Sequence, residues 1–397
     1  MNICLVSREY PPETGWGGIG TYSYILAHAL SLKGHPVHVI AQGLKGAHEQ
    51  QDGGVLVHRI AHRPIFAHES FLKEWSLRIE YSYYVRKKLN EIIQRYAIDV
   101  VEVPNFSAEG LIYSFFKKVP LVTRLHTHFS EVVQFLNRRP SRDHRYSCYL
   151  EDSAVLRSDL VTCSTKAHIA LVAKEVGIEE DRVKQIPLGV PLPDTHRNGL
   201  GLPHPAILFV GRLEKRKGVH MLMRAIPRVL KEFPQAHFFV VGRDTYMNEE
   251  GTYVEPSRGN SFKAWVLRDF PGEYLDRVHF LGYVEPDLLD QYYRECDFLV
   301  APSLYESFGF IYIEAMSYGK PVIGCSVGGV PEVVIEGNTG FLVPPEDSEA
   351  LARTISKLLR DPHLQKELGL QARRHVEENF SDEILAKNTI QAYSQLL

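Results

Sequence analysis

The stretch Asp297–Glu332 constrains the fold of this chain most, because two apolar runs enclose a helical pattern within it. Phe298–Ala301 and Val322–Cys325 are typical of buried strands, and the segment between them opens with an acidic turn. The helical pattern that follows runs to Tyr318 and ends at Gly319. A strand, an acidic turn, a helix and a second strand in this order predict an α/β fold with a parallel sheet.

The start of this helix predicts an anion site, because a helix N-terminus presents unpaired N–H groups and a positive dipole end. Ser307, Phe308 and Gly309 stand at that end, and glycine lets an anion approach the backbone closely. Glu306 before the helix and Glu314 within it bracket the site, and their spacing of eight residues corresponds to about 12 Å along a helix. That separation exceeds the roughly 5–9.5 Å of a glycosidase pair. The pair suits hydroxyls at two ends of one ligand, whereas a helix-capping Glu306 and a solvated Glu314 are the alternative.

The E-x7-E spacing within SLYESFGFIYIEAMSYGKPVIGCSVGGVPEVV resembles the signature of the family-4 retaining glycosyltransferases, and the similarity extends over nearly the whole chain. The resemblance implies the GT-B fold, in which two Rossmann-like domains with parallel sheets face each other across a cleft. It also implies that Glu314 binds the ribose hydroxyls of a nucleotide-sugar donor and that Glu306 binds hydroxyls of the transferred sugar. The Ser307–Gly309 amides would hold the diphosphate and the sugar.

A βαβ pattern with a glycine-rich first turn opens the chain. Ile3–Ser7 predicts the strand and Thr21–Lys33 the helix. Gly17 and Gly18 are expected to contact a phosphate or sugar through their backbone, as the resemblance also implies, while a packing role is equally compatible with Gly20. The turn lacks the GxGxxG spacing of dinucleotide-binding folds, so a nicotinamide cofactor is not expected.

Two histidines, His126 and His128, follow the predicted strand Leu121–Leu125. Ligands of parallel α/β sheets bind at the carboxyl ends of strands, so these side chains could bind a sugar hydroxyl or an acceptor phosphate. A structural role is the alternative. The resemblance implies that His126 faces the cleft, with His128 as second choice. No third metal ligand stands at useful spacing, so zinc is not expected.

Two further stretches of the first half have open interpretations. Residues 64–96 predict a long aromatic-rich helix, either a core or lid helix or part of an acceptor groove. Arg138, Arg139, Arg142 and Arg145 form a basic cluster, either a solvated surface loop or a clamp for an acceptor phosphate.

The second half repeats the plan of the first. Arg212 lies at the end of the predicted strand Ala206–Val210, and Lys217 lies just before a helix. Their cations would neutralise a diphosphate leaving group, and the GRxxxxKG pattern matches that of the family. The neighbouring Lys215 and Arg216 are interpreted as surface charge. By the same resemblance, main-chain groups at Val284 read the nucleotide base.

Domain boundaries follow from composition and from the resemblance. The proline-rich stretch Pro191–Pro205 predicts the linker. An acceptor domain is expected over residues 1–194, completed by a C-terminal helix at 381–397, and a donor domain over 200–380. Residues 243–261 insert polar sequence where family members have a short glycine turn. Leu188 stands where the family usually has asparagine, which weakens any polar role at that position.

Composition excludes several other classes. The formal net charge of −3 argues against a nucleic-acid binder. The 5 cysteines lack CxxC spacing, which favours reduced thiols in a cytoplasmic protein. No apolar run approaches the roughly 18 residues of a membrane span, so peripheral contact with the inner face of a membrane is the closest association expected.

The sequence thus predicts a retaining glycosyltransferase that uses a nucleotide diphosphate sugar and needs no metal or other cofactor. His126, Arg212, Lys217 and Glu306 are its expected catalytic residues. UDP-glucose or UDP-N-acetylglucosamine is the expected donor, by family frequency. The acceptor would be a glycan, a lipid-linked sugar or a small molecule, in polysaccharide or glycoconjugate biosynthesis. A GT-B epimerase acting on a UDP-sugar and a catalytically silent nucleotide-sugar sensor are the alternatives.

Overall fold

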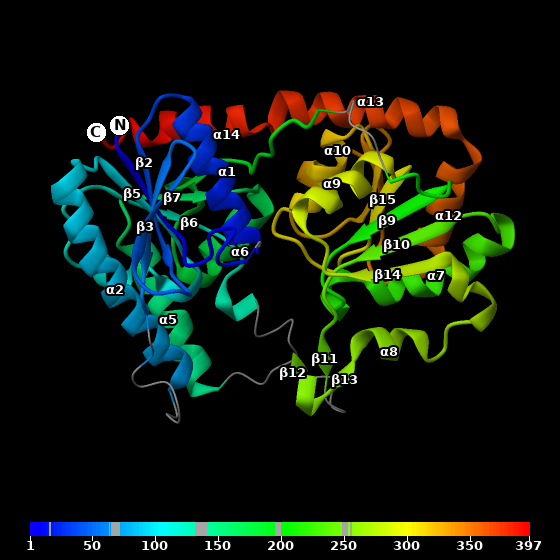
Figure 1. The fold of residues 1–397 in the computed structure, drawn as a ribbon, viewed down its shortest axis with the longest axis horizontal. Helices are drawn as coiled ribbons and strands as arrows, with labels where there is room; N and C mark the ends of the chain where they lie inside the picture. The colour runs from blue at the N-terminus through cyan, green and yellow to red at the C-terminus, as the bar shows by residue number, and fades with distance from the viewer. Residues whose placement is uncertain are drawn as a thin grey trace. The chain divides into compact units, whose positions relative to one another are not determined.

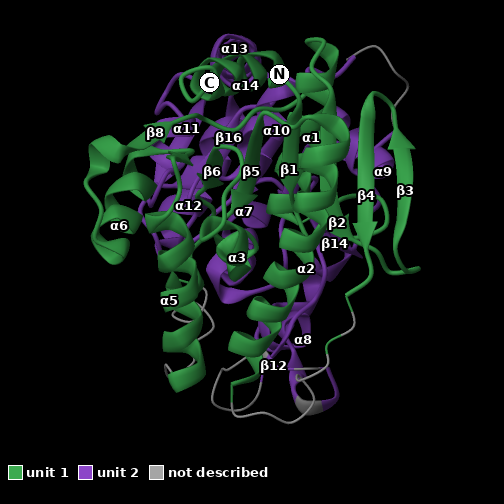
Figure 2. Ribbon diagram, turned by 90° about the vertical axis from the view of Figure 1, so that its left-hand side faces the viewer, with its two compact units in different colours: residues 1–191, 382–397 green, residues 192–381 purple. Residues whose placement is uncertain are grey.

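A computed structural model describes residues 1–15, 17–62, 64, 72–131, 141–194, 200–247, 253–254 and 256–397 (Figure 1). The described residues form two compact units, coloured separately in Figure 2. Unit 1 comprises Met1–Pro191 and Asp382–Leu397, and unit 2 comprises Leu192–Ser381. Five residues of the predicted linker, 195–199, lie outside the described ranges.

Unit 1 is built on an eight-stranded sheet with the order β3-β4-β2-β1-β5-β6-β7-β8. All neighbouring strands are parallel except the antiparallel pair of β3 and β4. Strands of a parallel sheet that helices cover on both faces are expected to be mostly apolar, because both of their faces are buried. The central strands β1, β2 and β5 fit this expectation, since they are almost entirely buried. The strands are β1 (Ile3–Val6), β2 (Val37–Gln42), β3 (His48–Asp52), β4 (Val55–Ile60), β5 (Val100–Pro104), β6 (Leu121–Arg124), β7 (Leu160–Cys163) and β8 (Val183–Gln185).

The C-terminal helix completes the helical layers of unit 1. α14 (Asp382–Tyr393) packs against α1 (Gly18–Leu32), and the two helices lie side by side in Figure 1. Leu385, Ala386 and Tyr393 of α14 are buried, so the last helix contributes to the core of the unit in which the chain begins. The other helices are α2 (Lys73–Tyr96), α3 (Leu111–Ser114), α5 (Arg142–Leu156) and α6 (Lys166–Val176).

Unit 2 has a six-stranded, all-parallel sheet with the order β14-β10-β9-β15-β16-β17. One continuous apolar core fills the space between this sheet and α7 and α12. The strands are β9 (Ala206–Val210), β10 (His237–Val241), β14 (Val278–Gly282), β15 (Phe298–Ala301), β16 (Val322–Cys325) and β17 (Gly340–Val343). The helices are α7 (Val219–Glu232), α8 (Phe262–Leu267), α9 (Pro286–Glu295), α10 (Phe310–Ser317), α11 (Val330–Val333), α12 (Ser348–Arg360) and α13 (Pro362–Asn379).

The polar insertion predicted at 243–261 forms a small antiparallel sheet in its described part. β11 (Tyr246–Met247) pairs with both β12 (Tyr253–Val254) and β13 (Asn260–Ser261). At the base of this sheet, the carboxylate of Asp244 accepts hydrogen bonds from the Ser261 hydroxyl at 2.5 Å and from the Lys263 N–H at 3.0 Å. Asp244 therefore holds the two ends of the insertion together. Residues 248–252 and 255 lie outside the described ranges.

Several predicted helix bounds are wrong for identifiable reasons. α2 begins at Lys73, and most of the predicted start at 64–71 lies outside the described residues. The apolar stretch Leu111–Lys118 predicts a helix to Lys118, but α3 ends at Ser114, because the backbone N–H groups of Lys118 and Val119 turn back to the Tyr113 hydroxyl. Phe262–Phe270 predicts a helix, but α8 ends at Leu267, and the predicted C-terminal helix at 381–397 ends at Tyr393 of α14.

The predicted placement of Glu306 before the helix and of Glu314 within it is confirmed. Gly309 adopts a left-handed conformation with a φ of 91°, so α10 starts only at Phe310. Glu306 precedes the helix, while Glu314 lies within it. The separation of 12 Å expected from helical rise therefore does not apply to this pair.

Candidate active site

Two loops of unit 2 meet because their strands are neighbours. β9 and β15 pair in parallel, so the segments that follow them, 211–218 and 302–309, leave the same edge of the sheet. The Leu304 N–H donates to the Arg216 carbonyl at 2.7 Å, which joins the two loops through their backbones. This contact brings together the two sequence patterns, GRxxxxKG and E-x7-E, that were predicted to share one site.

Lys217 and Glu306 form the centre of this cluster. The Lys217 Nζ lies 2.5 Å from the Glu306 Oε1, and the Ser303 hydroxyl donates to the same oxygen at 2.9 Å. Burial alone would raise the pKa of the Glu306 carboxyl, but the charges of Lys217 and Arg216 outweigh it and hold that pKa below its ordinary value. Glu306 is therefore an ionised carboxylate that holds an ammonium group in place.

A second carboxylate, Glu214, organises the arginines of the same loop. Its Oε1 lies 2.9 Å from the Arg216 Nη2 and 3.3 Å from the Arg212 Nη2. The Arg212 side chain is 59% exposed, so its guanidinium is anchored at one end and accessible to a ligand. Arg216 is 16% exposed and lies 3.7 Å from the Glu306 Oε2. The interpretation of Arg216 as surface charge is therefore wrong, because it packs into the cluster, and Arg216 and Glu214 are site residues that the sequence analysis missed.

Gly218 explains how the two loops approach so closely. Its φ is +71°, and a Cβ at this position would lie 1.8 Å from the Pro302 carbonyl oxygen. Only glycine combines this backbone conformation with the contact. The position of Lys217 beside Glu306 thus depends on the residue that follows it.

The predicted anion site at the start of α10 is formed by main chain. Gly309 is the N-cap, and a Cβ there would lie 2.6 Å from the Tyr312 ring. The Phe308 side chain is buried against Phe310 and Phe380. The side chain of Phe308 is therefore part of the core, and a ligand could reach Phe308 only through its backbone.

Glu314 is held by a tyrosine from the preceding helix. The Tyr293 hydroxyl donates to the Glu314 Oε2 at 2.7 Å, and the Tyr293 ring stacks on Tyr318 at 5.9 Å between centroids. Burial raises the pKa of Glu314. Tyr293 is a third site residue that the sequence analysis missed, after Arg216 and Glu214. Val284, the predicted base reader, is half-buried in the segment between β14 and α9.

The glycine-rich turn of unit 1 contacts a carboxylate of its own chain. Gly17 is the N-cap of α1, and a Cβ there would lie 2.2 Å from the Glu9 Oε2. Gly18 has open space at the corresponding position, whereas a Cβ at Gly20 would meet the Gly15 carbonyl at 3.0 Å. Of the roles considered for Gly20, packing fits this geometry. Contacts of Gly17 and Gly18 with a ligand remain predictions.

His126 lies at the carboxyl end of β6. Its backbone N–H donates to the Asn105 Oδ1 at 2.7 Å, and its ring packs edge-to-face with Tyr22 at 5.3 Å. Burial, together with the charges of Arg124 and His168, lowers the pKa of His126 well below its ordinary value. No described residue hydrogen-bonds the His126 ring nitrogens. The neutral ring can therefore bind a hydroxyl group of a ligand.

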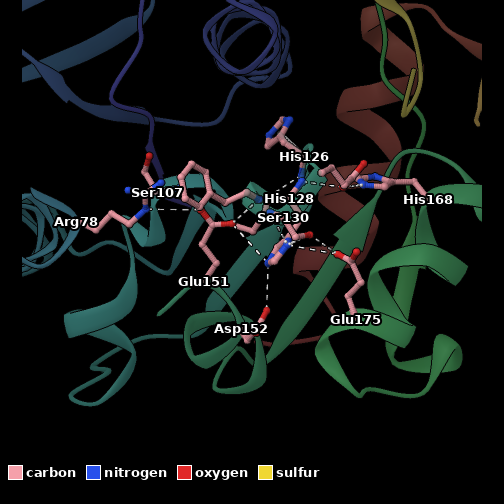
Figure 3. A network of polar contacts seen from close by, with 12 residues as sticks. Arg78, Ser107, His126, His128, Ser130, Glu151, Asp152, His168 and Glu175 are labelled. Atoms are coloured by element: carbon pink, nitrogen blue, oxygen red, sulfur yellow. Dashed lines mark hydrogen bonds and ion pairs between the residues drawn. The ribbon is translucent and has the colours of Figure 1, made fainter. Parts of the chain in front are cut away.

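His128, the second choice, is committed to other residues (Figure 3). Its Nε2 lies 3.1 Å from the Asp152 Oδ1 and 3.6 Å from the Glu151 Oε2. Its Nδ1 lies 2.8 Å from the Ser130 hydroxyl and 3.3 Å from the Glu175 Oε2. Burial alone would lower the pKa of His128, but these carboxylates outweigh it and raise the pKa to about 10. The charged ring is enclosed in this cluster, and in Figure 3 the His126 ring points away from it.

The same cluster holds the loop that carries His126. Glu131 accepts a hydrogen bond from the His128 N–H at 2.8 Å, and its Oε1 lies 3.1 Å from the His168 Nε2. Glu151 accepts from the Phe129 N–H at 3.0 Å. The chain after β6 is therefore fixed by buried charges at several points.

The remaining candidates of unit 1 do not join a defined site. Arg142 and Arg145 are exposed on α5, while Arg138 and Arg139 lie outside the described residues. Within the described ranges, no group of three or more His, Cys, Asp or Glu side chains has the geometry of a metal site. All 5 cysteines have free thiols.

A helix with the length and apolar character needed to cross a bilayer is missing from the part of the chain that the structure describes.

Two sequence families match this chain in succession. Residues 16–193 match the profile described as Glycosyltransferase Family 4, and residues 194–375 match the profile described as Glycosyl transferases group 1. The glycogen synthase of Mycobacterium tuberculosis is 28% identical over 417 residues, which cover 99% of this chain and 94% of that protein.

Solved structures share the fold. The sucrose-phosphate synthase of Thermosynechococcus elongatus is similar with a TM-score of 0.79 and 24% identity, over 100% of this chain and 98% of that one. The Anabaena HepE protein in complex with UDP-glucose is similar with a TM-score of 0.71 and 20% identity, over 100% of each chain.

Proposed function

Because this chain belongs to the family-4, group 1 glycosyltransferases and has their GT-B fold, we propose that it is a retaining enzyme that transfers a hexose from a UDP-sugar to a carbohydrate hydroxyl. Glycosyltransferase activity follows from the family. The UDP-sugar, the retained configuration and the acceptor are our proposal. A UDP-glucose complex of HepE and the glycogen synthase relative support a glucose-type donor and a glycan-type acceptor.

The observation that carries the proposal is the ion pair of Lys217 and Glu306 at 2.5 Å. An ammonium group that is buried costs desolvation energy, and burial lowers the pKa of Lys217. Such a group is suited to binding a ligand that carries negative charge. A diphosphate arriving beside Lys217 would compete with Glu306 for the ammonium and leave the carboxylate available to sugar hydroxyls.

The proposed reaction needs charge stabilisation more than proton transfer by the protein. The bond between the anomeric carbon and the diphosphate oxygen breaks, and a bond from that carbon to the acceptor oxygen forms on the same face. The acceptor proton passes to the leaving phosphate oxygen. Arg212 and Lys217 would stabilise the charge that develops on the diphosphate, together with the main chain of Ser307–Gly309.

The other residues would bind and orient. Glu314, held by Tyr293, offers carboxylate oxygens to ribose hydroxyls, and Val284 offers its main chain to the base. In unit 1, the neutral His126 ring offers an uncommitted nitrogen to a sugar hydroxyl, and Gly17 and Gly18 offer backbone groups. The proposal uses no metal ion, since two cations stand where the leaving group would be.

A donor screen tests the proposal directly. UDP-, GDP- and ADP-sugars are added to the protein, and thermal unfolding is followed. A UDP-sugar at about 100 times its Kd should stabilise the protein by about 2.7 kcal/mol. With glucans and simple glycosides as acceptors, UDP release should then depend on the acceptor, and NMR of the product should show the anomeric configuration of the donor. An inverted product, or stabilisation by GDP- or ADP-sugars alone, would refute the donor or mechanism proposed.

A matched pair of variants tests the assigned cation. Arg212→Ala should lower kcat by about 10²-fold or more with little change in stability, because its side chain is mostly exposed. Arg228 has an equally exposed side chain, at 58%, and an ion pair with Glu349 on the helical surface of unit 2. Arg228→Ala should leave kcat unchanged. Equal activity of the two variants would contradict the role of Arg212.

A further inference from the structure

A buried carboxylate in unit 1 joins three elements that are distant in sequence. Glu102 of β5 accepts a hydrogen bond from the Tyr22 hydroxyl of α1 at 2.8 Å. Its other oxygen accepts from the Tyr393 hydroxyl of α14 at 2.7 Å, across 291 residues of sequence. Glu102 is 4% exposed, Tyr22 2% and Tyr393 0%. The C-terminal helix is thus attached to the central sheet by a polar contact inside the core.

Tyr22 connects this carboxylate to the candidate active site. Its ring packs edge-to-face with the His126 ring, at 5.3 Å between centroids and 68° between planes. The guanidinium of Arg124 lies 4.9 Å from the centroid of the same tyrosine ring. Arg124 is held in turn by the Ile186 carbonyl at 2.8 Å. Tyr22 is therefore restrained at its hydroxyl and over its ring, and His126 packs on the restrained ring.

Stability alone does not account for this arrangement. Burying a carboxylate and a guanidinium costs several kcal/mol, and apolar side chains of similar volume often give equal or greater stability. A buried carboxylate whose two oxygens both accept hydrogen bonds instead selects one arrangement of the side chains that it joins. Here the two Glu102 oxygens accept hydrogen bonds from the Tyr22 and Tyr393 hydroxyls, which belong to two helices. The arrangement that they select places the Tyr22 ring against the His126 ring.

From this geometry we infer that Tyr22, Glu102 and Tyr393 are positioning residues that orient the His126 ring for sugar transfer. The inference rests on the proposed function. Tyr393 acts through Glu102 and Tyr22, although it belongs to the last helix of the chain. The contact therefore makes the orientation of His126 depend on the docking of α14.

The ionised form of Glu102 is the one that accepts both hydroxyls. Burial raises the pKa of Glu102, and Arg124 and the hydroxyls of Tyr393 and Tyr22 oppose this rise. These three side chains come from β6, α14 and α1, the elements that face the carboxylate. Loss of the Tyr393 hydroxyl removes one opposing contribution, so Glu102 should take up a proton at a higher pH. A protonated Glu102 can no longer accept from both tyrosines.

The test compares two tyrosine hydroxyls of the same unit. Tyr393→Phe should lower kcat by about 10- to 100-fold with the donor KM unchanged, because misplaced reacting groups cost this much. The acid limb of its kcat–pH profile should move to higher pH. Tyr113→Phe is the control, since Tyr113 is equally buried and its hydroxyl bonds only the main chain of Lys118 and Val119. It should keep the wild-type kcat and profile.

A second measurement separates this inference from the proposed function. The ring resonance of His126 in protein with isotope-labelled histidine, assigned by its loss in His126→Asn, should shift in Tyr393→Phe and stay in Tyr113→Phe. A wild-type protein without transferase activity would end the proposed function, while the resonance would still test the contact. If Tyr393→Phe fails to fold, the isosteric Glu102→Gln serves in its place. An unmoved resonance, together with an unchanged kcat and pH profile, would overturn the inference.

Discussion

The ion pair of Lys217 and Glu306 gives the sharpest prediction, because stability and activity should respond to it differently. Lys217→Met removes the ammonium and keeps an unbranched side chain of similar length. If the ammonium stabilises the leaving diphosphate, kcat should fall by about 10²- to 10³-fold. The fall should persist at saturating donor, since the lost interaction is strongest in the transition state.

The same change should destabilise unit 2. Removing one partner of a buried pair costs about 3–5 kcal/mol, because the remaining charge is left without its partner. Glu306 keeps the Ser303 hydroxyl at 2.9 Å and Arg216 at 3.7 Å, so a loss near 3 kcal/mol is expected. Adding Glu306→Gln removes the unpaired charge. The double variant should recover about 2–3 kcal/mol as coupling energy, while its kcat stays low.

The pH dependence has a definite sign. In the wild type, the pKa of Glu306 lies below its ordinary value, so its charge stabilises the fold above that value and the contribution is lost as pH falls. In Lys217→Met, burial should dominate and raise this pKa. The destabilisation of the variant should then shrink as the pH is lowered from 7 to about 5, because Glu306 can take up a proton.

Urea unfolding of unit 2 can be followed by the fluorescence of Trp265 on α8, after Trp16 and Trp75 are replaced by Phe. Turnover is measured in the unaltered background. Recovery of kcat in the double variant would show that Lys217 only balances the charge of Glu306. The role assigned to its ammonium in the reaction would then be wrong.

Three further predictions concern single positions. His128→Gln should lose stability at pH 7. The difference from wild type should fade as pH rises through about 10, because a histidine with a raised pKa stabilises the fold while it is charged and loses this contribution when it deprotonates. Unfolding in urea from pH 6 to 10 checks this. Gly218→Ala should destabilise the protein by far more than the roughly 1 kcal/mol expected for the control Gly34→Ala. Gly34 has a similar φ of +85°, but a Cβ there would meet open space. Thermal unfolding of the two variants measures the difference. Tyr293→Phe should raise the donor KM about fivefold with kcat nearly unchanged, because Glu314 loses one hydrogen bond that orients it.

Local sequence patterns predicted much of the secondary structure correctly. The strands β9, β15 and β16 have the bounds expected from sequence, and the helical patterns at Lys166–Val176 and Val219–Glu232 are those of α6 and α7. α6 illustrates the reason, because Thr165 caps its start by accepting from the His168 N–H and Gly177 ends it in a left-handed conformation. Such elements carry their own boundary signals within a few residues.

Two strands at the edge of the unit 1 sheet were missed, because they depend on each other more than on their own sequences. β3 is a polar edge strand, and its sequence His-Glu-Gln-Gln-Asp lacks the apolar alternation that marks a half-buried strand. β4, its partner, was missed with it.

The sequence motifs of the candidate site could be predicted, but the residues that hold the motif residues in place could not. The patterns around Lys217 and Glu306 identified residues that the structure brings together. In the run Lys-Arg-Lys, however, nothing local distinguishes Arg216, whose side chain packs between two carboxylates, from an exposed surface arginine. Its partners become visible only when the loops after β9 and β15 meet. Tyr293 and Glu102 were missed for the same reason, since their contacts cross from one element to another.

The docking of α14 has a consequence for dissecting the molecule. An N-terminal fragment ending at Pro191 would lack Tyr393, and the helix α1 would lose the apolar surface that covers it. In such a fragment the Glu102 carboxylate, which is buried in the full chain, would be exposed to solvent. A synthetic peptide spanning Asp382–Leu397 carries the missing surface and should bind this fragment, so unit 1 can be reconstituted from two pieces.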